Sequence, residues 1–279
     1  MTAPRLSVCI IACNEERNLG RCLDSVSFAD EIVVVVDGRS ADATESIARA
    51  RGCRVLVHPY AGNVAQKNVA LDQARGEWVL ALDADEGASP GLAAEIRRLL
   101  EGAPAEDGYE LNRLTWHLGR WIRHGDFFPD WQLRLFRRAR GRWAGIDPHG
   151  RVALEGSVGR LLEPLHHWSY RDLADQVERI QEFSRVQAGA LRAEGRRARL
   201  SDLLLRPPAR FLRAYLLKAG FLDGVPGLVI AAATAFHVFL KYAKLWELDA
   251  LPPGSDAPEG AAGKARLSSA RPGASDTSR

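Results

Sequence analysis

Short apolar runs alternate with helical patterns in the first half of the chain. The runs at 6–12, 31–36, 54–57 and 78–82 are rich in Val, Ile and Leu. Parallel strands that are covered on both faces have this near-continuous apolar character. A segment with helical periodicity follows each run, so the pattern predicts βαβ units and a mixed, mainly parallel α/β sheet with flanking helices.

Three of these helices have candidate N-terminal caps. Asn14 precedes EERNLGRCLDSV, Ser40 precedes ADATESIARARG, and Ser89 precedes a Pro at the first helical position. Side chains of Asn and Ser accept hydrogen bonds from the first free amides of a helix, and Pro is favoured directly after them. We therefore expect helices to begin at these three residues.

The pattern changes after residue 108. GYELNRLTW and WQLRLFRR predict short strands with interleaved aromatic and basic residues, and 170–200 predicts a charged amphipathic helix. Apolar helices follow, interrupted at Pro207-Pro208 and near Gly224, before a tail of Pro, Gly, Ser and Ala that we expect to be disordered. The predicted parts are 1–112 (nucleotide-sugar-binding), 113–169 (acceptor side), 170–251 (helical C-terminal region) and 252–279 (tail).

Residues 224–240 carry no formal charge, although Pro226 interrupts them early. A spanning helix needs about 20 apolar residues, so this stretch is at the margin. Arg and Lys flank it on both sides, which suits a helix that lies on anionic lipid. A buried helix of a C-terminal subdomain is the alternative.

Composition and charge narrow the function classes. An apolar content of 46% and a charged content of 26% are typical of a soluble globular protein. Residues 1–112 hold 11 Lys and Arg against 18 Asp and Glu, which is a net charge of −7. Because the whole chain has a net charge of +3, residues 113–279 carry a net charge of +10. An acidic front half and a basic back half indicate surfaces with different partners.

The four cysteines and the N-terminus indicate the compartment. All four cysteines lie in the first 53 residues without CxxC spacing, so neither a zinc site nor a disulfide framework is predicted. The segment MTAPRLSVCIIACNEE lacks the apolar core and cleavage site of a signal peptide. We therefore expect the chain to begin in the cytoplasm.

Carboxylates follow three of the predicted strands. Glu15 comes after the first strand, Asp37 after the second, and Asp83 and Asp85 after the fourth. Ligands of open parallel sheets bind at the carboxyl ends of the strands. The pair Asp83 and Asp85 is suited to share a hard divalent cation with substrate phosphates, although an exposed acidic turn is the alternative.

The chain has no GxGxxG after a strand and no GxxxxGK[ST], which argues against dinucleotide dehydrogenases and P-loop enzymes. Lys67 lies near the start of the helix that follows the third strand. A lysine there, together with the helix N-terminus, is suited to face a pyrophosphate. A solvated helix residue is the alternative.

Several ordered motifs together resemble one family. LSVCIIACNEERNL, VVVVDGRSADAT, AQKNVALDQARGEWVLALDADE and FPDWQLRLFRR resemble the family 2 glycosyltransferases of the GT-A fold. LNRLTW, DPHGRV and LLKAGFLDGVPGLVIAAATAFHVFLKYAKLWEL look like the lipopolysaccharide-core β-1,4-glucosyltransferase branch of that family. The resemblance covers residues 5–248.

The resemblance implies roles for the strand-end residues. Glu15 and Asp37 would contact the uridine of a UDP-sugar, with Lys67 near the nucleotide. Asp83 would lie near the ribose and the metal, and Asp85 would coordinate the Mg²⁺ or Mn²⁺ that bridges the diphosphate. The first nucleotide-binding motif commonly reads P-x-Y-N-E, whereas this chain has Ile11 and Cys13 at the first and third positions and so lacks the aromatic that packs on the base.

An inverting transfer needs a carboxylate that takes the proton from the attacking acceptor hydroxyl. The family places this base after the D-x-D motif, which implies Asp130, with Asp126 and Asp147 as alternatives. His149 is a candidate third metal ligand or acceptor contact. Trp116, Trp121 and Trp131 are candidates for stacking on sugar rings or for core packing.

The leading interpretation is a metal-dependent inverting hexosyltransferase, with glucose as the expected sugar. It would use a UDP-sugar and a glycolipid or oligosaccharide acceptor of the lipopolysaccharide core, at the cytoplasmic face of the inner membrane. It predicts binding to an anionic membrane surface and no nucleic-acid partner. The alternatives are a sugar nucleotidyltransferase and a membrane adaptor that binds nucleotide sugar without turnover.

Overall fold

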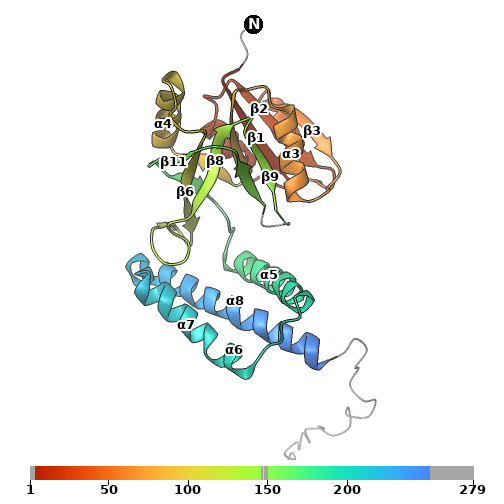
Figure 1. The fold of residues 1–279 in the computed structure, drawn as a ribbon, viewed down its shortest axis with the longest axis vertical. Coiled ribbons are helices and arrows are strands. Elements are labelled where there is room, and N and C mark those ends of the chain that lie inside the picture. The colour runs from red at the N-terminus through yellow and green to blue at the C-terminus, as the bar shows by residue number, and fades with distance from the viewer. Residues whose placement is uncertain (1–3, 146, 148–149, 252–279) are drawn as a thin grey trace, which may run out of the picture.

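The computed structural model describes residues 4–145, 147 and 150–251. Figure 1 shows a sheet with helices packed around it and, below it in this view, a layer formed by the C-terminal helices. The predicted tail at 252–279 and the candidate ligand His149 lie outside the described residues.

Four parallel strands form one half of the main sheet. They are β1 (Leu6–Ala12), β2 (Glu31–Asp37), β3 (Arg54–His58) and β4 (Trp78–Asp83), in the order β3-β2-β1-β4. All four predicted strands are confirmed. Because the strands are parallel, the residues that follow them meet at one edge of the sheet.

Helices cover both faces of this half. α1 (Leu19–Ser25), α2 (Thr44–Ala50) and α4 (Pro90–Glu101) pack on one face, and α3 (Asn63–Gln73) packs on the other. Successive side chains of a strand point to opposite faces, so Val8 and Ile10 join the first core whereas Cys9 joins the second. A strand that is buried on both faces has no polar face, which explains the continuous apolar runs.

Two of the three predicted helix starts are wrong. α1 begins at Leu19 and α2 at Thr44, whereas α4 begins as predicted, with the Ser89 hydroxyl accepting a hydrogen bond from the amide of Leu92. Asn14 has a φ of 53°, its amide donates to the Ser40 hydroxyl, and its side chain accepts from the amide of Ala41. The two predicted caps therefore connect the turns after β1 and β2 instead of capping helices.

The other half of the sheet is mixed. β8 (Trp131–Arg137) lies antiparallel between β4 and β6 (Gly108–His117). The sheet is completed by β12 (Leu165–His167), β5 (Glu86–Ala88), β7 (Arg120–Ile122) and β11 (Val158–Arg160). β9 (Gly141–Ala144) and β10 (Arg151–Leu154) form a separate hairpin beside α3. The predicted α/β class is confirmed.

The C-terminal layer consists of α5 (Leu173–Ala193), α6 (Leu200–Leu204), α7 (Arg206–Leu212), a π-helical turn (Arg213–Leu217), a 3-10 turn (Gly220–Asp223) and α8 (Gly224–Ala250). α5 packs on α8 through a small core that includes Ala188, Tyr242 and Leu245. The predicted interruptions coincide with the starts of α7 and α8. The segment Gly220–Ala250 is long and apolar enough to cross a membrane, and 22% of its most apolar 18-residue stretch is buried.

A buried carboxylate connects the amino ends of the central strands. Glu31, the first residue of β2, accepts hydrogen bonds from the Ser7 hydroxyl (2.6 Å) and from the amide and guanidinium of Arg75 (2.9 and 2.7 Å). Burial raises the pKa of Glu31, but these hydrogen bonds and the charge of Arg75 outweigh burial, so the pKa lies below its usual range.

Replacement of this carboxylate should lower stability in a pH-dependent way. We expect Glu31→Gln to reduce the free energy of unfolding by about 1–3 kcal/mol at neutral pH, because a buried charged acceptor is lost. A depressed native pKa gives stability that is present above the unfolded pKa of about 4.3 and is lost as the pH falls through the native pKa. Urea unfolding from pH 7 to pH 3 should show the two proteins converging in acid. Glu45→Gln on the surface of α2 is the control and should change little.

Candidate active site

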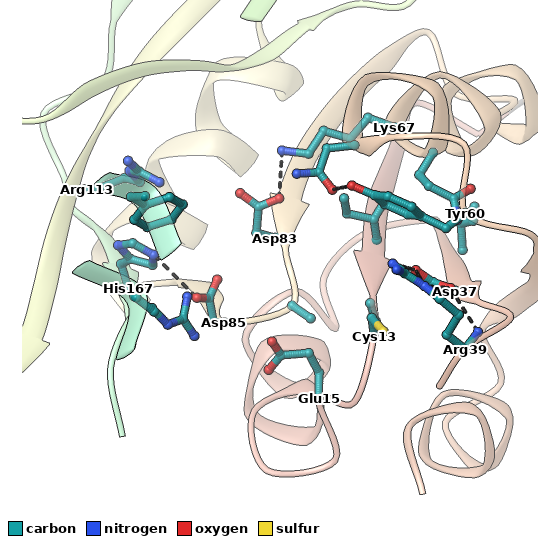
Figure 2. A pocket seen from close by; sticks show the side chains of 18 residues that line it. Cys13, Glu15, Asp37, Arg39, Tyr60, Lys67, Asp83, Asp85, Arg113 and His167 are labelled. Carbon is teal, nitrogen blue, oxygen red and sulfur yellow. Dashed lines mark hydrogen bonds and ion pairs between the residues drawn. The ribbon is translucent and has the colours of Figure 1, made fainter. Parts of the chain in front are cut away.

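A pocket of about 500 Å³ lies at the carboxyl edge of the parallel strands. Figure 2 shows side chains from the turns after β1, β2 and β4 on one side of it and from β6 and β12 on the other. Seven of the predicted site residues line it: Ile11, Cys13, Glu15, Asp37, Lys67, Asp83 and Asp85. The other described lining residues are Ala12, Val35, Arg39, Tyr60, Asn63, Gln66, Ala84, Arg113, His167, Arg179 and Phe183.

Two cations hold the Asp83 carboxylate at the end of β4. The ammonium group of Lys67, in the second turn of α3, lies 2.7 Å from one oxygen, and the guanidinium of Arg134 on β8 lies 2.8 Å from the other. Burial by itself raises the pKa of Asp83, but the two cations outweigh burial and hold the pKa far below its usual range. Asp83 is therefore an anion whose two oxygens are both occupied by ion pairs.

Glu86 connects this ion pair to the neighbouring strands. Its side chain is fully buried, and it lies 2.7 Å from the guanidinium of Arg134 and 3.1 Å from that of Arg113. Its second oxygen accepts a hydrogen bond from the amide of Asp83. Loss of one partner would leave a buried charge uncompensated, so the partners stay together. Because Glu86 binds the backbone of Asp83 as well as the two guanidinium groups, this network fixes the shape of the turn that carries both predicted metal ligands.

Asp85 lies next to His167 at one side of the pocket (Figure 2). The imidazole Nε2 lies 3.5 Å from a carboxylate oxygen of Asp85, and the backbone carbonyl of Asp85 accepts a hydrogen bond from the amide of Trp168. Burial raises the pKa of Asp85, whereas the neighbouring imidazole lowers it, and the net shift is downward. The carboxylate is therefore ionised at neutral pH and available to a cation.

The residues present fit a divalent cation that is shared with a substrate. Asp85 and His167 supply one oxygen and one nitrogen donor, while Asp83 is engaged by Lys67 and Arg134. Among the described residues no group of three or more His, Cys, Asp or Glu side chains is placed to hold a metal ion alone. Mg²⁺ and Mn²⁺ sites of nucleotide enzymes commonly take their remaining ligands from phosphates and water.

The opposite end of the pocket holds Asp37, Arg39 and Tyr60. The guanidinium of Arg39 contacts both oxygens of Asp37 and lies 4.0 Å from the centre of the Tyr60 ring. Hydrogen bonds from Arg39 hold the pKa of Asp37 below its usual range. An aromatic ring and a cation thus line the same pocket as Cys13, where the sequence lacks an aromatic residue.

Glu15 lies between these two ends. Its backbone amide donates to the Thr44 hydroxyl (2.7 Å), and its carboxylate accepts a hydrogen bond from the side-chain amide of Asn18. Burial, reinforced by the charge of Asp85, raises the pKa of Glu15. The hydrogen bond to Thr44 joins the turn after β1 to the start of α2, next to the hydrogen bond between Asn14 and Ser40.

The structure separates the three candidate bases. The Asp130 carboxylate lies 2.6 Å from the guanidinium of Arg113, which lines the pocket, and accepts a hydrogen bond from the side-chain amide of Gln132 (2.7 Å), whereas Asp130 itself is not among the described lining residues. Asp126 is buried against Arg210 and Lys218 of the helical layer. Asp147 accepts a hydrogen bond from the amide of Val64 at the start of α3. Of the three, Asp130 alone is connected to a described lining residue by an ion pair.

The candidate sugar-stacking tryptophans lie in different surroundings. Trp116 packs edge-on against Trp121, which also stacks on His166. The ring of Trp131 is covered by the guanidinium of Arg160 at 4.6 Å. The described lining of the pocket includes none of these three rings.

Eleven lining residues were not singled out from the sequence, and they include the following five. Arg113 lies on β6, His167 on β12 and Arg179 and Phe183 on α5, while Tyr60 follows β3. The basic and aromatic interleaving of 108–116 is the one signal that points to Arg113. The amphipathic pattern of α5 predicts a helix with one buried face, but it does not tell which part of the fold that face contacts.

Comparison with known proteins identifies the family. Residues 7–153 match the model of the glycosyl transferase family 2. The chain belongs to this family. This glycosyltransferase is 30% identical to the lipopolysaccharide core biosynthesis glycosyltransferase LpsC of Rhizobium meliloti, over 88% of this chain and 93% of LpsC. The predicted family is therefore confirmed.

Two further similarities of the transferase are weaker. An uncharacterized glycosyltransferase of Rickettsia typhi is 29% identical over 88% of this chain and 87% of its own length. The mannosyltransferase PcManGT from Pyrobaculum calidifontis, solved with GDP-Man and Mn²⁺, is 17% identical over 88% of each chain, with a TM-score of 0.47.

Proposed function

We propose that this glycosyltransferase is a metal-dependent inverting enzyme that transfers a hexose, with glucose as the expected sugar, from a UDP-sugar to a lipopolysaccharide-core or other membrane-linked glycan. The observation that carries the proposal is the pocket at the sheet edge, in a chain of this family, where Asp37, Asp83 and Asp85 lie along one wall. The similarity to LpsC supports the acceptor class.

The charges around the pocket suit a nucleoside diphosphate. Lys67 and Arg134 flank Asp83, and Arg113 and Arg179 line the opposite wall. Preorganised cations stabilise the charge that develops on a leaving diphosphate. Asp85 and His167 would hold Mg²⁺ or Mn²⁺, which when bound supplies further positive charge for the diphosphate.

The other end of the pocket suits a nucleobase and ribose. Asp37 offers carboxylate oxygens to ring N–H or hydroxyl groups, and the Tyr60 ring offers a flat apolar surface. Because Arg39 occupies both oxygens of Asp37 in this structure, base binding would require Arg39 to move or to share the carboxylate. Glu15 and Cys13 lie between the two ends and complete this wall.

Asp130 is the proposed base. It would accept the proton of the acceptor hydroxyl as that oxygen attacks the anomeric carbon from the side opposite the departing UDP. The ion pair with Arg113 orients the carboxylate beside the wall of the pocket. Asp126 and Asp147 are engaged elsewhere in the fold, which favours Asp130 among the three.

The helical layer supports the proposed attachment to the cytoplasmic face of the inner membrane. Large apolar side chains are exposed along it, and the most exposed is Leu217 at 83%. Others are Leu200, Leu204, Leu205, Leu212, Leu216, Phe221, Leu222 and Val225. Arg206 and Arg213 lie among them in the sequence. Apolar residues interleaved with cations are suited to an anionic lipid surface.

A UDP-release assay tests the activity. The purified chain, screened with several UDP-sugars and a lipopolysaccharide-core acceptor, should release UDP with Mn²⁺ or Mg²⁺ and not with EDTA. Asp85→Ala should reduce release to background, because the pocket loses a charged cation ligand. Asp72→Asn, on the exposed surface of α3, is the control. Undiminished turnover by Asp85→Ala would refute metal-dependent catalysis, and donor binding without UDP release would instead favour the adaptor.

The proposed base is tested by separating binding from turnover. Asp130→Asn should lower kcat by about 10²-fold or more and leave the affinity for UDP near that of the wild type, since general base catalysis contributes about 10²–10⁴-fold. Calorimetry with UDP and Mn²⁺ measures the affinity. Normal turnover by Asp130→Asn would exclude this residue and direct the search to Asp126 and Asp147.

Membrane attachment is tested with vesicles of phosphatidylglycerol and phosphatidylcholine. We expect the chain to co-sediment with the anionic vesicles, and high salt to release it in part, because screening weakens the contribution of the cations. Leu217→Ser should weaken binding, whereas Leu162→Ser, equally exposed on the sheet domain at 82%, should not. Equal effects of both substitutions would contradict this surface.

A further inference from the structure

Two buried carboxylates lie where the β7–β8 loop (residues 123–130) meets the C-terminal helices. The side chain of Asp126 is 4% exposed and that of Asp223 is 1% exposed. Asp126 belongs to the loop, and Asp223 precedes α8. The partners of Asp126 lie on the helical side, and the partners of Asp223 lie on β7 and the loop. The two carboxylates therefore connect the loop and the helices in both directions.

Asp223 holds the first part of the loop. One of its oxygens accepts hydrogen bonds from the backbone amides of Arg123 (3.0 Å) and His124 (2.8 Å). The guanidinium of Arg120 on β7 donates to the carbonyl of Asp223 and lies 3.4 Å from its other oxygen. Loop amides without a regular strand partner are thus satisfied by a carboxylate from the helical layer.

Asp126 holds the next part of the loop. Its two oxygens lie 2.9 Å from the guanidinium of Arg210 on α7 and 3.0 Å from the ammonium group of Lys218. The amide of Gly125 donates to the carbonyl of Lys218. The helices are closely packed here, because a Cβ at Gly220 would come within 2.7 Å of the carbonyl of Ala214. The backbone on the helical side of the junction is therefore tightly packed and has little space in which to move.

The loop then leads directly to the proposed base. Phe127 stacks on Tyr170, which precedes α5. Asp130 lies four residues after Asp126, and its amide donates to the side chain of Asn112 on β6. Contacts from the helical layer and from Tyr170 beside it therefore hold residues 123–127 of the loop, and β6 holds Asp130 at its end.

We propose that Asp126 and Asp223 are positioning residues for the acceptor side of the site: they fasten the β7–β8 loop, and through it Asp130, to the C-terminal helices. This inference rests on the proposed function. The described lining of the donor pocket includes neither residue, so their effect is on acceptor geometry and not on nucleotide binding. It also gives Asp126, a candidate base from the sequence, a different role.

The junction should be sensitive to single substitutions because its carboxylates are buried. If one partner of a buried ion pair is removed, the other charge is left uncompensated, and the structure around it shifts or opens to water. A shift of about 1 Å at a reacting group can lower the rate about 10²-fold. Asp130 lies four residues after Asp126, so a displacement of Asp126 would act on Asp130 through this short stretch of the loop.

The test compares Asp126→Asn, Asp223→Ala and Asp223→Asn with the wild type in the full-length protein. Asp126→Asn and Asp223→Ala should speed hydrogen exchange at residues 123–127 and lower kcat at least about tenfold. The affinity for UDP with Mn²⁺ should stay within about twofold of the wild type, because the pocket and the junction share no side chain. Asp223→Asn retains an amide oxygen for the loop amides and should recover most of the activity. Asp72→Asn is again the control.

The outcomes separate this inference from the proposed function. A wild-type protein that releases no UDP refutes the proposed function and this inference with it. An active wild type, with either variant turning over normally, refutes this inference alone, as does a loss of UDP affinity that parallels the loss of kcat. If Asp223→Ala does not fold, Asp126→Asn carries the test, since the asparagine preserves the shape of the side chain.

Discussion

The site depends on the compensation of charge around Glu86. This fully buried carboxylate joins Arg134 on β8 and Arg113 on β6, and it accepts a hydrogen bond from the amide of Asp83. Removal of any one member would leave an uncompensated charge in the interior. The network therefore fixes the turn after β4 relative to the strands that cross beside it.

Two consequences follow from this network. First, Asp83 is held by Lys67 and Arg134, so it organises cations around the pocket while Asp85 is left to face His167. Second, Arg113 extends the network to Asp130. One set of ion pairs thus connects the proposed donor end of the site with the proposed acceptor end. The helical layer adds to both ends, through Arg179 and Phe183 in the pocket and through the junction at Asp126 and Asp223.

Much of the fold and part of the site could be predicted because they depend on local pattern. The four parallel strands are short, apolar on both faces and bounded by polar turns, and their positions were predicted to within one residue. Residues that follow parallel strands share one edge, so Glu15, Asp37, Asp83 and Asp85 were expected together and do line one pocket. The starts of α1 and α2 were wrong because Asn14 and Ser40 bond each other across two turns, a contact between distant residues.

The sequence by itself determined the class of sheet, the edge that carries the pocket and the family, because periodicity and motif order are properties of neighbouring residues. Only the tertiary structure decided that His167 faces Asp85, that Arg113 lies between Glu86 and Asp130, and that Tyr60 lines the same pocket as Cys13. It also decided that Asp126 joins the helical layer. Partners of a buried charge are selected by distance in the folded chain, and residues far apart in the sequence carry no local signal of that distance.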